Sequence, residues 1–397
     1  MMPMRTLPMM LASAAFVGLA AAPAFALDGA DLVAKFNAAS AVNGTTISYD
    51  GADVDGDTVT LSNVALKTVG SDKDLKIGEV TLEGVEEYED GGYYVETVSL
   101  PDVDLSETEG SLSVKDIAVG GLTIPANPNG GTIDDMLLYE SASTGPVTVT
   151  NKGKQVFALE SIEANLSRQE SDTGFDFDAA LKGVKADLSD VEDAKAKDAI
   201  QKLGLTSLAG GMTMKGSWEI ASGNIALDEY ALDFANVGRL NMTFNISGYT
   251  LEFIKAIQEA MKAQEANPNK EEANQALGLA MMGLMQQLTF NGASIRFDDA
   301  SITKRVLDYL GKEQGMSGDQ LAQSLKGLVP VMMAQLNVPE LQNQVSAAAN
   351  SYLDQPKSLT ISAKPDKPVP FPMIMGAAMG APNTVPSVLG VKVTAND

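Results

Sequence analysis

The chain has 397 residues, and it contains neither cysteine nor histidine. The missing residue types exclude disulfides and Ser-His-Asp or Cys-His catalysis, and they argue against zinc or iron–sulfur ligation. A formal net charge of −24 makes nucleic acid an unfavourable partner, because binding phosphates requires clustered Lys and Arg.

The N-terminus has the pattern of a secretory signal peptide. Arg5 is the only charged residue among the first 27, and an apolar run follows at 9–22. That run is too short to span a bilayer, which takes ~20 apolar residues, and Ala24-Phe25-Ala26 fits an Ala-x-Ala cleavage site. We expect residues 1–26 to be cleaved after Ala26, with an uncleaved anchor as the alternative. The mature protein is then periplasmic and has no transmembrane segment.

A β-rich region is predicted from 27 to 249, opening with a short helix at about 30–39. Within it, apolar and polar residues alternate strictly at 240–247, and Trp218 alternates with polar neighbours. Period-two patterns are typical of strands that bury one face of a sheet and expose the other. We therefore expect sheet, with Trp218 facing its core.

The first half of this region repeats a short phrase. Val-polar-Leu-x-x-Val occurs at 59–64, 80–85 and 98–103, with turn residues between the copies. The spacing is too uneven for a solenoid and favours a meander of antiparallel strands. One helix interrupts the meander at about 190–203, with a capping box predicted at 189–192.

A helix-rich region is predicted from 250 to 356. Asn269 and Ser317 fit N-cap positions, and Pro339 fits the first turn of the last helix. A strand pair is predicted to interrupt the helices at 288–297. The apolar residues of the helices recur at helical spacing, which gives each helix one apolar side.

The final region, 357–397, returns to strand around 359–361 and 389–393, on either side of a Pro-rich link at 364–386. Strands at the end of the chain are expected to rejoin the main sheet. The fold class is therefore α+β: a long antiparallel β-meander forming a curved sheet, a helical segment packed on it, and C-terminal strands returning to the sheet. We expect 27–397 to form one continuous unit.

An acidic turn is the one candidate metal site. Asp53, Asp55 and Asp57 lie close together near Gly56, and carboxylate oxygens are ligands that Ca²⁺ prefers. The spacing does not fit an EF-hand, and an acidic turn without metal explains it equally. No other cofactor is expected.

Catalytic motifs are incomplete. Ser301-Ile302-Thr303-Lys304 matches an S-x-x-K motif, but no K-T-G or K-S-G follows it. Ser301 is better explained as a helix cap. We expect no enzymatic activity.

Methionines gather in the helix-rich region. Thioethers form adaptable apolar surfaces, and they also bind Cu(I), although no His or Cys is present to support a copper site. Core packing explains most of these residues, and the lining of an apolar ligand site is the alternative. The candidate lining residues are Met281, Met282, Met285, Leu325 and Met332.

Three phrases carry a family resemblance: Gly56 to Val64, Phe234 to Leu240, and Leu389 to Val393. Short strands in a long meander, followed by amphipathic helices, resemble AsmA-like and YdgA-like bacterial envelope proteins. The export signal and Pro-rich tail resemble exported proteins of alphaproteobacteria. The resemblance implies an envelope-maintenance or lipid-handling role without an active site.

Three functions remain open from the sequence. The first is an envelope-maintenance or lipid-binding protein in which helices cover an apolar sheet face. The second is a structural or protein-interaction protein of the cell envelope without a small ligand. The third is a carboxylate-based hydrolase, because pairs of acidic residues are common in this chain. The expected partners are lipid or another apolar ligand, or envelope proteins.

Overall fold

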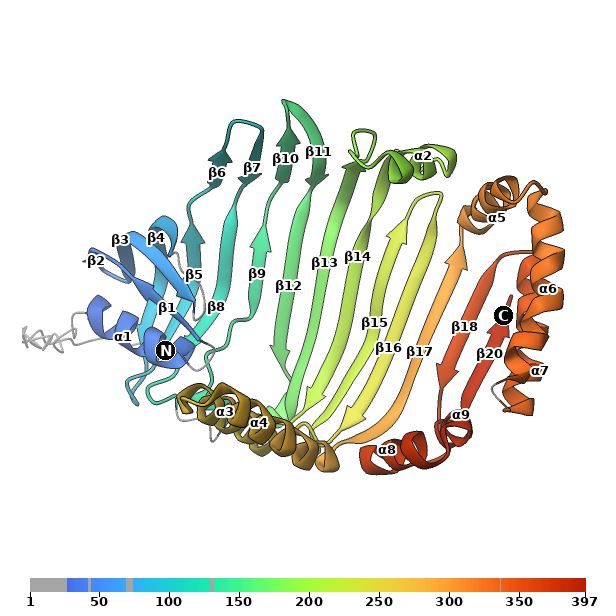
Figure 1. Ribbon diagram of the computed structural model, residues 1–397. Coiled ribbons are helices and arrows are strands. Elements are labelled where there is room, and N and C mark those ends of the chain that lie inside the picture. The colour runs from blue at the N-terminus through green and yellow to red at the C-terminus, as the bar shows by residue number, and fades with distance from the viewer. Residues whose placement is uncertain (1–26, 42–43, 69–73, 129–131, 336) are drawn as a thin grey trace, which may run out of the picture.

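A computed structural model describes residues 27–397, apart from 42–43, 69–73, 129–131 and 336. The fold is α+β, as predicted: among the described residues, 20 strands form one sheet with antiparallel pairings, and helices pack against it (Figure 1). The predicted signal peptide, 1–26, lies outside the described residues. Within the described ranges, no helix is long and apolar enough to cross a membrane.

The N-terminal part of the sheet has the main hydrophobic core. Helix α1 (Gly29–Ser40) places Leu32 and Val33 against this part of the sheet, where both side chains are buried. Val59, Val95 and Ile124 are buried beneath them. The strands here are β1 (Thr45–Ser48), β2 (Gly51–Asp55), β3 (Thr58–Thr68), β4 (Leu75–Glu87), β5 (Tyr93–Leu100) and β8 (Ile117–Ile124).

A polar cluster fixes α1 to this core. The hydroxyl of Tyr93, a residue only 1% exposed, donates to the Asp31 carboxylate over 2.7 Å. Lys35 pairs with Asp31 and donates to the Gly91 carbonyl over 2.7 Å. Lys35 and then Tyr93 hold the pKa of Asp31 below its ordinary value by hydrogen bonding to the charged form.

The repeated phrase of the sequence contains a β-bulge in its first two copies. Asn63 and Gly84, at the same position of the phrase, both adopt left-handed backbone, with φ of 51° and 64°. The extra residue shifts the alternation by one, so that Leu61 and Val64 both point into the core, and register shifts accompany it. Gly121 and Gly183 repeat this conformation in β8 and in β13 (Gly174–Asp187).

The middle of the sheet continues through long antiparallel strands to the C-terminus of the chain. The predicted strand pair at 288–297 is wrong: the segment is one strand, β17 (Thr289–Asp299). Asn291-Gly292 forms no turn there but lies at a register shift opposite β16. The strands are β6 (Val103–Ser106), β7 (Gly110–Val114), β9 (Ser141–Thr144), β10 (Val147–Asn151), β11 (Lys154–Leu159), β12 (Ser161–Arg168), β14 (Ser207–Glu219), β15 (Asn224–Phe234), β16 (Gly238–Ser247), β18 (Ser358–Ala363), β19 (Val369–Pro370) and β20 (Val391–Ala395).

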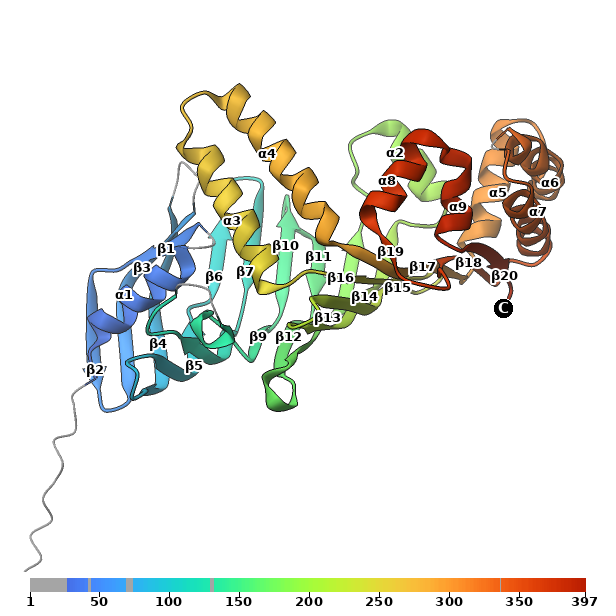
Figure 2. The same ribbon diagram turned by 90° about the horizontal axis from the view of Figure 1, so that it is seen from below.

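The helices stand at the ends of the strands and at the C-terminal edge of the sheet (Figures 1 and 2). Helices α3 and α4 form a hairpin at one end of the strands, beside α8 and α9, and α2 and α5 lie at the other end. Helix α7 packs along β20. Their bounds are α2 (Ala194–Lys202), α3 (Leu251–Ala266), α4 (Lys270–Leu284), α5 (Ile302–Glu313), α6 (Gly318–Ala334), α7 (Pro339–Asp354), α8 (Phe371–Gly380) and α9 (Val385–Val388), with 3-10 turns at 133–135, 170–172, 285–287 and 382–384.

The predicted caps have mixed outcomes. Asn269, Ser317 and Pro339 occupy the predicted positions of α4, α6 and α7. The box at 189–192 is wrong, because Asp193 caps α2 by accepting from the Ala196 amide over 2.7 Å.

The segment at 364–386 is more than a link. It contains helix α8. Pro372 is compatible with this helix because it lies in the first turn, where the backbone N–H that proline lacks is not needed.

Two edge strands of the sheet, β1 and β20, lie against helices. On β1, Ile47 exchanges two hydrogen bonds of 2.9 and 2.7 Å with the side-chain amide of Asn37 from α1. On β20, the Val393 amide donates to Gln344 of α7 over 3.2 Å. Side chains thereby occupy backbone groups that an edge strand otherwise leaves free.

Candidate functional site

The strands β12 to β18 and β20 present one continuous apolar face. Strand register places apolar residues directly opposite one another along two rows that cross all of these strands. We call the face formed by these two rows the apolar face. The first row is Ala164, Ala179, Met214, Tyr230, Met242, Ile295, Ile361 and Val393; the second is Ile162, Leu181, Met212, Leu232, Leu240, Phe297, Leu359 and Ala395.

The apolar face is partly open to solvent. No residue in either row is fully buried, and Ile295 and Ile361 are 48% and 47% exposed. Phe244, beside the rows on β16, is 38% exposed. A contiguous exposed apolar surface is uncommon in a soluble protein and marks an interaction site.

The helices lie on the same side of the sheet as this face. Trp218 stacks on Phe175 at 6.1 Å between ring centroids, and meets Tyr249 edge-on at 6.3 Å. Tyr249 in turn contacts Phe253, the buried residue of α3, at 5.3 Å. Trp218 therefore faces α3 at one end of its strand, and its indole donates to the Tyr249 carbonyl over 2.8 Å. Figure 2 shows α2, α3, α4 and α8 rising from this one side.

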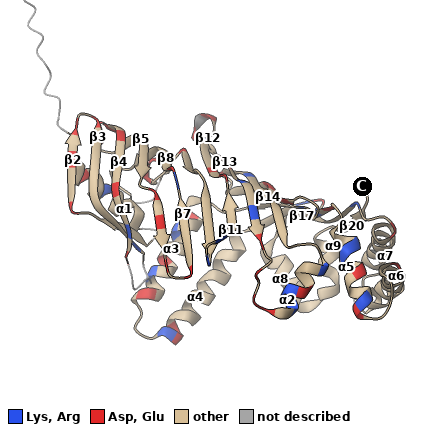
Figure 3. Ribbon diagram, turned by 90° about the horizontal axis from the view of Figure 1, so that it is seen from above, with Lys and Arg blue, Asp and Glu red and all other residues tan. Residues whose placement is uncertain are grey.

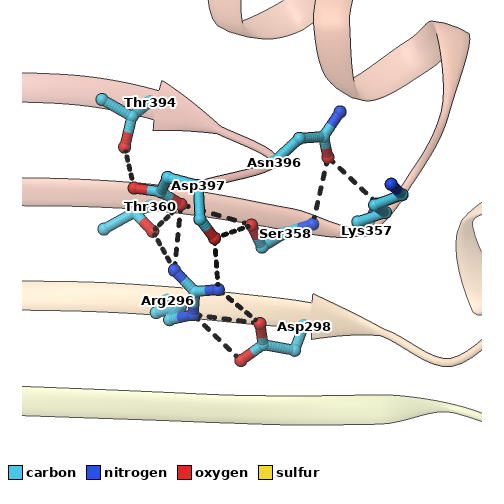
Figure 4. A network of polar contacts seen from close by, with 8 residues as sticks. All are labelled: Arg296, Asp298, Lys357, Ser358, Thr360, Thr394, Asn396 and Asp397. Carbon is cyan, nitrogen blue, oxygen red and sulfur yellow. Dashed lines mark hydrogen bonds and ion pairs between the residues drawn. The ribbon is translucent and has the colours of Figure 1, made fainter.

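The opposite face of the same strands is polar, and Figure 4 shows the part of it on β17, β18 and β20. Arg296 on β17 donates to both oxygens of Asp298, over 3.0 and 3.1 Å, and to Asp397 over 2.9 Å. The Thr394 hydroxyl, and more weakly Arg296, lower the pKa of the Asp397 carboxyl by hydrogen bonding to its charged form. Thr360 accepts from Arg296 over 3.2 Å. The ion pairs and hydrogen bonds of these side chains satisfy their polar groups within the sheet.

A polar cavity of about 680 Å³ lies where β8 and β9 meet β12 and β13. Glu140 and Asp178 both line it, together with Arg168. Asp178 accepts from the Asn165 amide over 2.9 Å, and Arg168 donates to Asp134 over 3.0 Å. The contacts of Asp178 and Arg168 are those of a structural network.

The candidate apolar lining residues divide into two groups. Three lie at the α3–α4 end of the strands: Met281 and Met282 on α4, and Met285 in the 3-10 turn that follows it. Leu325 and Met332 lie on α6, beyond the C-terminal edge of the sheet. Met282 and Met332 are 56% and 58% exposed. The structure does not bring the five together around one site.

The other candidates are not assembled into sites. Asp53, Asp55 and Asp57 are exposed residues of the β2–β3 hairpin, and the described residues include no group of three potential ligands that could hold a metal.

Ser301 precedes α5 but does not cap it: Asp299 accepts from the Thr303 amide over 2.8 Å, and the Ser301 hydroxyl donates to the Asn236 carbonyl over 2.9 Å.

The sequence predicted an apolar sheet face covered by helices, but it did not identify the residues that form the face. Individual strands showed the alternation, but the alignment of apolar residues across strands depends on register, which a single strand does not encode. The bulges at Gly183 and near Asp228 preserve the alignment.

Comparison with known proteins gives a family model described as "Uncharacterized protein", which is similar to residues 231–396. This segment begins in β15 and contains β16 to β20 and α3 to α9. No curated protein matches the chain.

Proposed function

We propose that the protein is a non-catalytic, exported protein of the bacterial envelope that binds a lipid, or another ligand with a long apolar chain, on the apolar face. One observation carries the proposal: two aligned rows of apolar side chains cross the strands from β12 to β20, and none is fully buried. Helices flank the face on the same side, which shields a ligand from bulk water at both ends of the strands.

The dimensions suit an acyl chain. Seven spacings of ~4.8 Å separate β12 from β20, so the rows are about 34 Å long. A bilayer leaflet contains acyl chains in a layer of about 15 Å, half of a ~30 Å hydrocarbon core. The rows are therefore long enough for one or two chains, and each buried methylene contributes about 0.8 kcal/mol.

A fluorescent fatty acid tests the proposal. Trp218, the only tryptophan, borders the apolar face and can transfer excitation to a conjugated polyene such as parinaric acid. Ile361→Glu places a carboxylate on the apolar face, whereas Ser362→Glu places the same group on the polar face of the same strand. We expect Ile361→Glu to weaken binding about tenfold or more, because it removes roughly 1.5–3 kcal/mol of apolar contact. Ser362→Glu should bind as the unsubstituted protein does.

Mass spectrometry identifies the ligand class. The mature protein, made in a bacterial periplasm and purified without detergent, should release a lipid on denaturation that its native mass includes. A clean apo mass together with no transfer from Trp218 contradicts the proposal. The alternative, a protein-interaction role without a small ligand, then gains support from a stoichiometric partner recovered from envelope extract.

A further inference from the structure

Two stretches of the chain without charged residues meet at one end of the strands. No Asp, Glu, Lys or Arg occurs from Ala273 to Ile295, or from Pro368 to Val391, in a chain in which 20% of residues are charged. The stretches pack together, since the Phe371 amide donates to the Leu288 carbonyl over 3.0 Å. We call residues 276–287 together with 371–388 the uncharged rim.

The uncharged rim is exposed as well as apolar. Helix α8 contains no buried residue, and its Met373 and Met379 are 58% and 83% exposed. On α4, Leu279 and Met282 are 71% and 56% exposed. Figure 3 shows the contrast along α4, which is charged near its start and tan over the half that reaches the sheet.

A contiguous exposed apolar patch is typical of a surface that binds a protein or a membrane. We infer that the uncharged rim docks on the surface of a neutral lipid bilayer, with α8 and the second half of α4 in contact with the acyl boundary. Helices of this kind lie in the interfacial plane of a bilayer by burying apolar side chains.

The net charge of the protein distinguishes between the possible binding partners of the uncharged rim. A second copy of this chain would bring together two molecules that each have a formal net charge of −24, which long-range repulsion opposes. The same repulsion disfavours anionic head groups. A zwitterionic bilayer has no net charge and therefore does not repel the protein. Because the rim has no cationic side chains, its binding involves no electrostatic attraction that salt could screen.

Vesicle flotation tests the inference, independently of acyl-probe binding in solution. The mature protein should float with phosphatidylcholine vesicles, equally at low and high salt, and less well when phosphatidylglycerol is added. Met373→Glu and Leu279→Glu should each abolish flotation. Met332→Glu is the matched control, because Met332 has the same 58% exposure as Met373 but lies on α6, outside the rim.

The outcomes separate the inference from the proposed function. Rim variants that lose flotation but still bind parinaric acid support the inference, and Ile361→Glu should show the reverse. Unsubstituted protein that does not float with phosphatidylcholine overturns the inference, as does equal loss in Met332→Glu. A dimer in sedimentation that Met373→Glu dissociates would assign the rim to a second copy and would also overturn it. Circular dichroism checks that every variant is folded.

Discussion

A comparison of Gly84 with Gly56 separates two contributions to the free energy of unfolding: the cost of left-handed backbone and the cost of close packing. Gly56 and Gly84 have the same φ of 64°, but a Cβ on Gly56 would have no neighbour within 4 Å, whereas a Cβ on Gly84 would lie 2.7 Å from the Cβ of Glu96. Left-handed backbone costs an L-residue about 1–2 kcal/mol. Because the contact atom on Glu96 is its Cβ, no rotamer relieves it and the two strands must move apart, which adds about 1–3 kcal/mol of overpacking.

We therefore expect Gly56→Ala to lower the free energy of unfolding by about 1–2 kcal/mol and Gly84→Ala by about 2–5 kcal/mol. Urea unfolding followed by circular dichroism measures both. Combining Gly84→Ala with Glu96→Gly should restore the packing part of the loss and leave the backbone part, which a double-mutant cycle isolates. Equal losses for Gly56→Ala and Gly84→Ala would refute the packing argument, and no loss in either would refute the left-handed conformation.

Three further predictions concern α1, low pH and the helix caps. Tyr93→Phe should cost about 1–2 kcal/mol, because the hydroxyl donates to a carboxylate that keeps its lysine partner and some water; unfolding in urea measures it. The pKa of Asp31 is lowered in the folded state from 3.8, so its contribution is present above pH 3.8 and is lost as pH falls through the lower folded value; an acid titration of Asp31→Asn should lack that part of the decline, and an unchanged acid profile would contradict the assignment. Ser317→Ala should cost about 1 kcal/mol by removing a capping box, whereas Ser301→Ala, which removes no cap, should cost about 0.5 kcal/mol or less, as thermal unfolding would show.

The strands and several helix termini were predictable because their signals are local. The alternation at 240–247 became β16, and Asn269 and Ser317 cap the predicted helices. The bulge was also visible in principle: in Leu-Ser-Asn-Val at 61–64 and Leu-Glu-Gly-Val at 82–85 the apolar spacing changes from two to three, with Asn or Gly at the extra position.

The placement of the helices was not predictable by the same reasoning. An apolar side on a helix predicts burial against some partner but does not name it. Helices α3 and α4 pack on each other as a hairpin, and α6 packs between α5 and α7, so the methionines expected around one ligand lie at two places. The solvent exposure of the apolar face depends on which helices pack on one another, and tertiary contacts decide that packing.

The two side-chain amides at the sheet edges have a consequence for assembly. An open sheet of 20 strands resembles a short section of a fibril, and each new strand added to an edge would itself become an edge. Asn37 and Gln344 occupy backbone groups of Ile47 and Val393 with which a further strand would otherwise pair. At these two positions the chain itself occupies the backbone groups through which another molecule would extend the sheet.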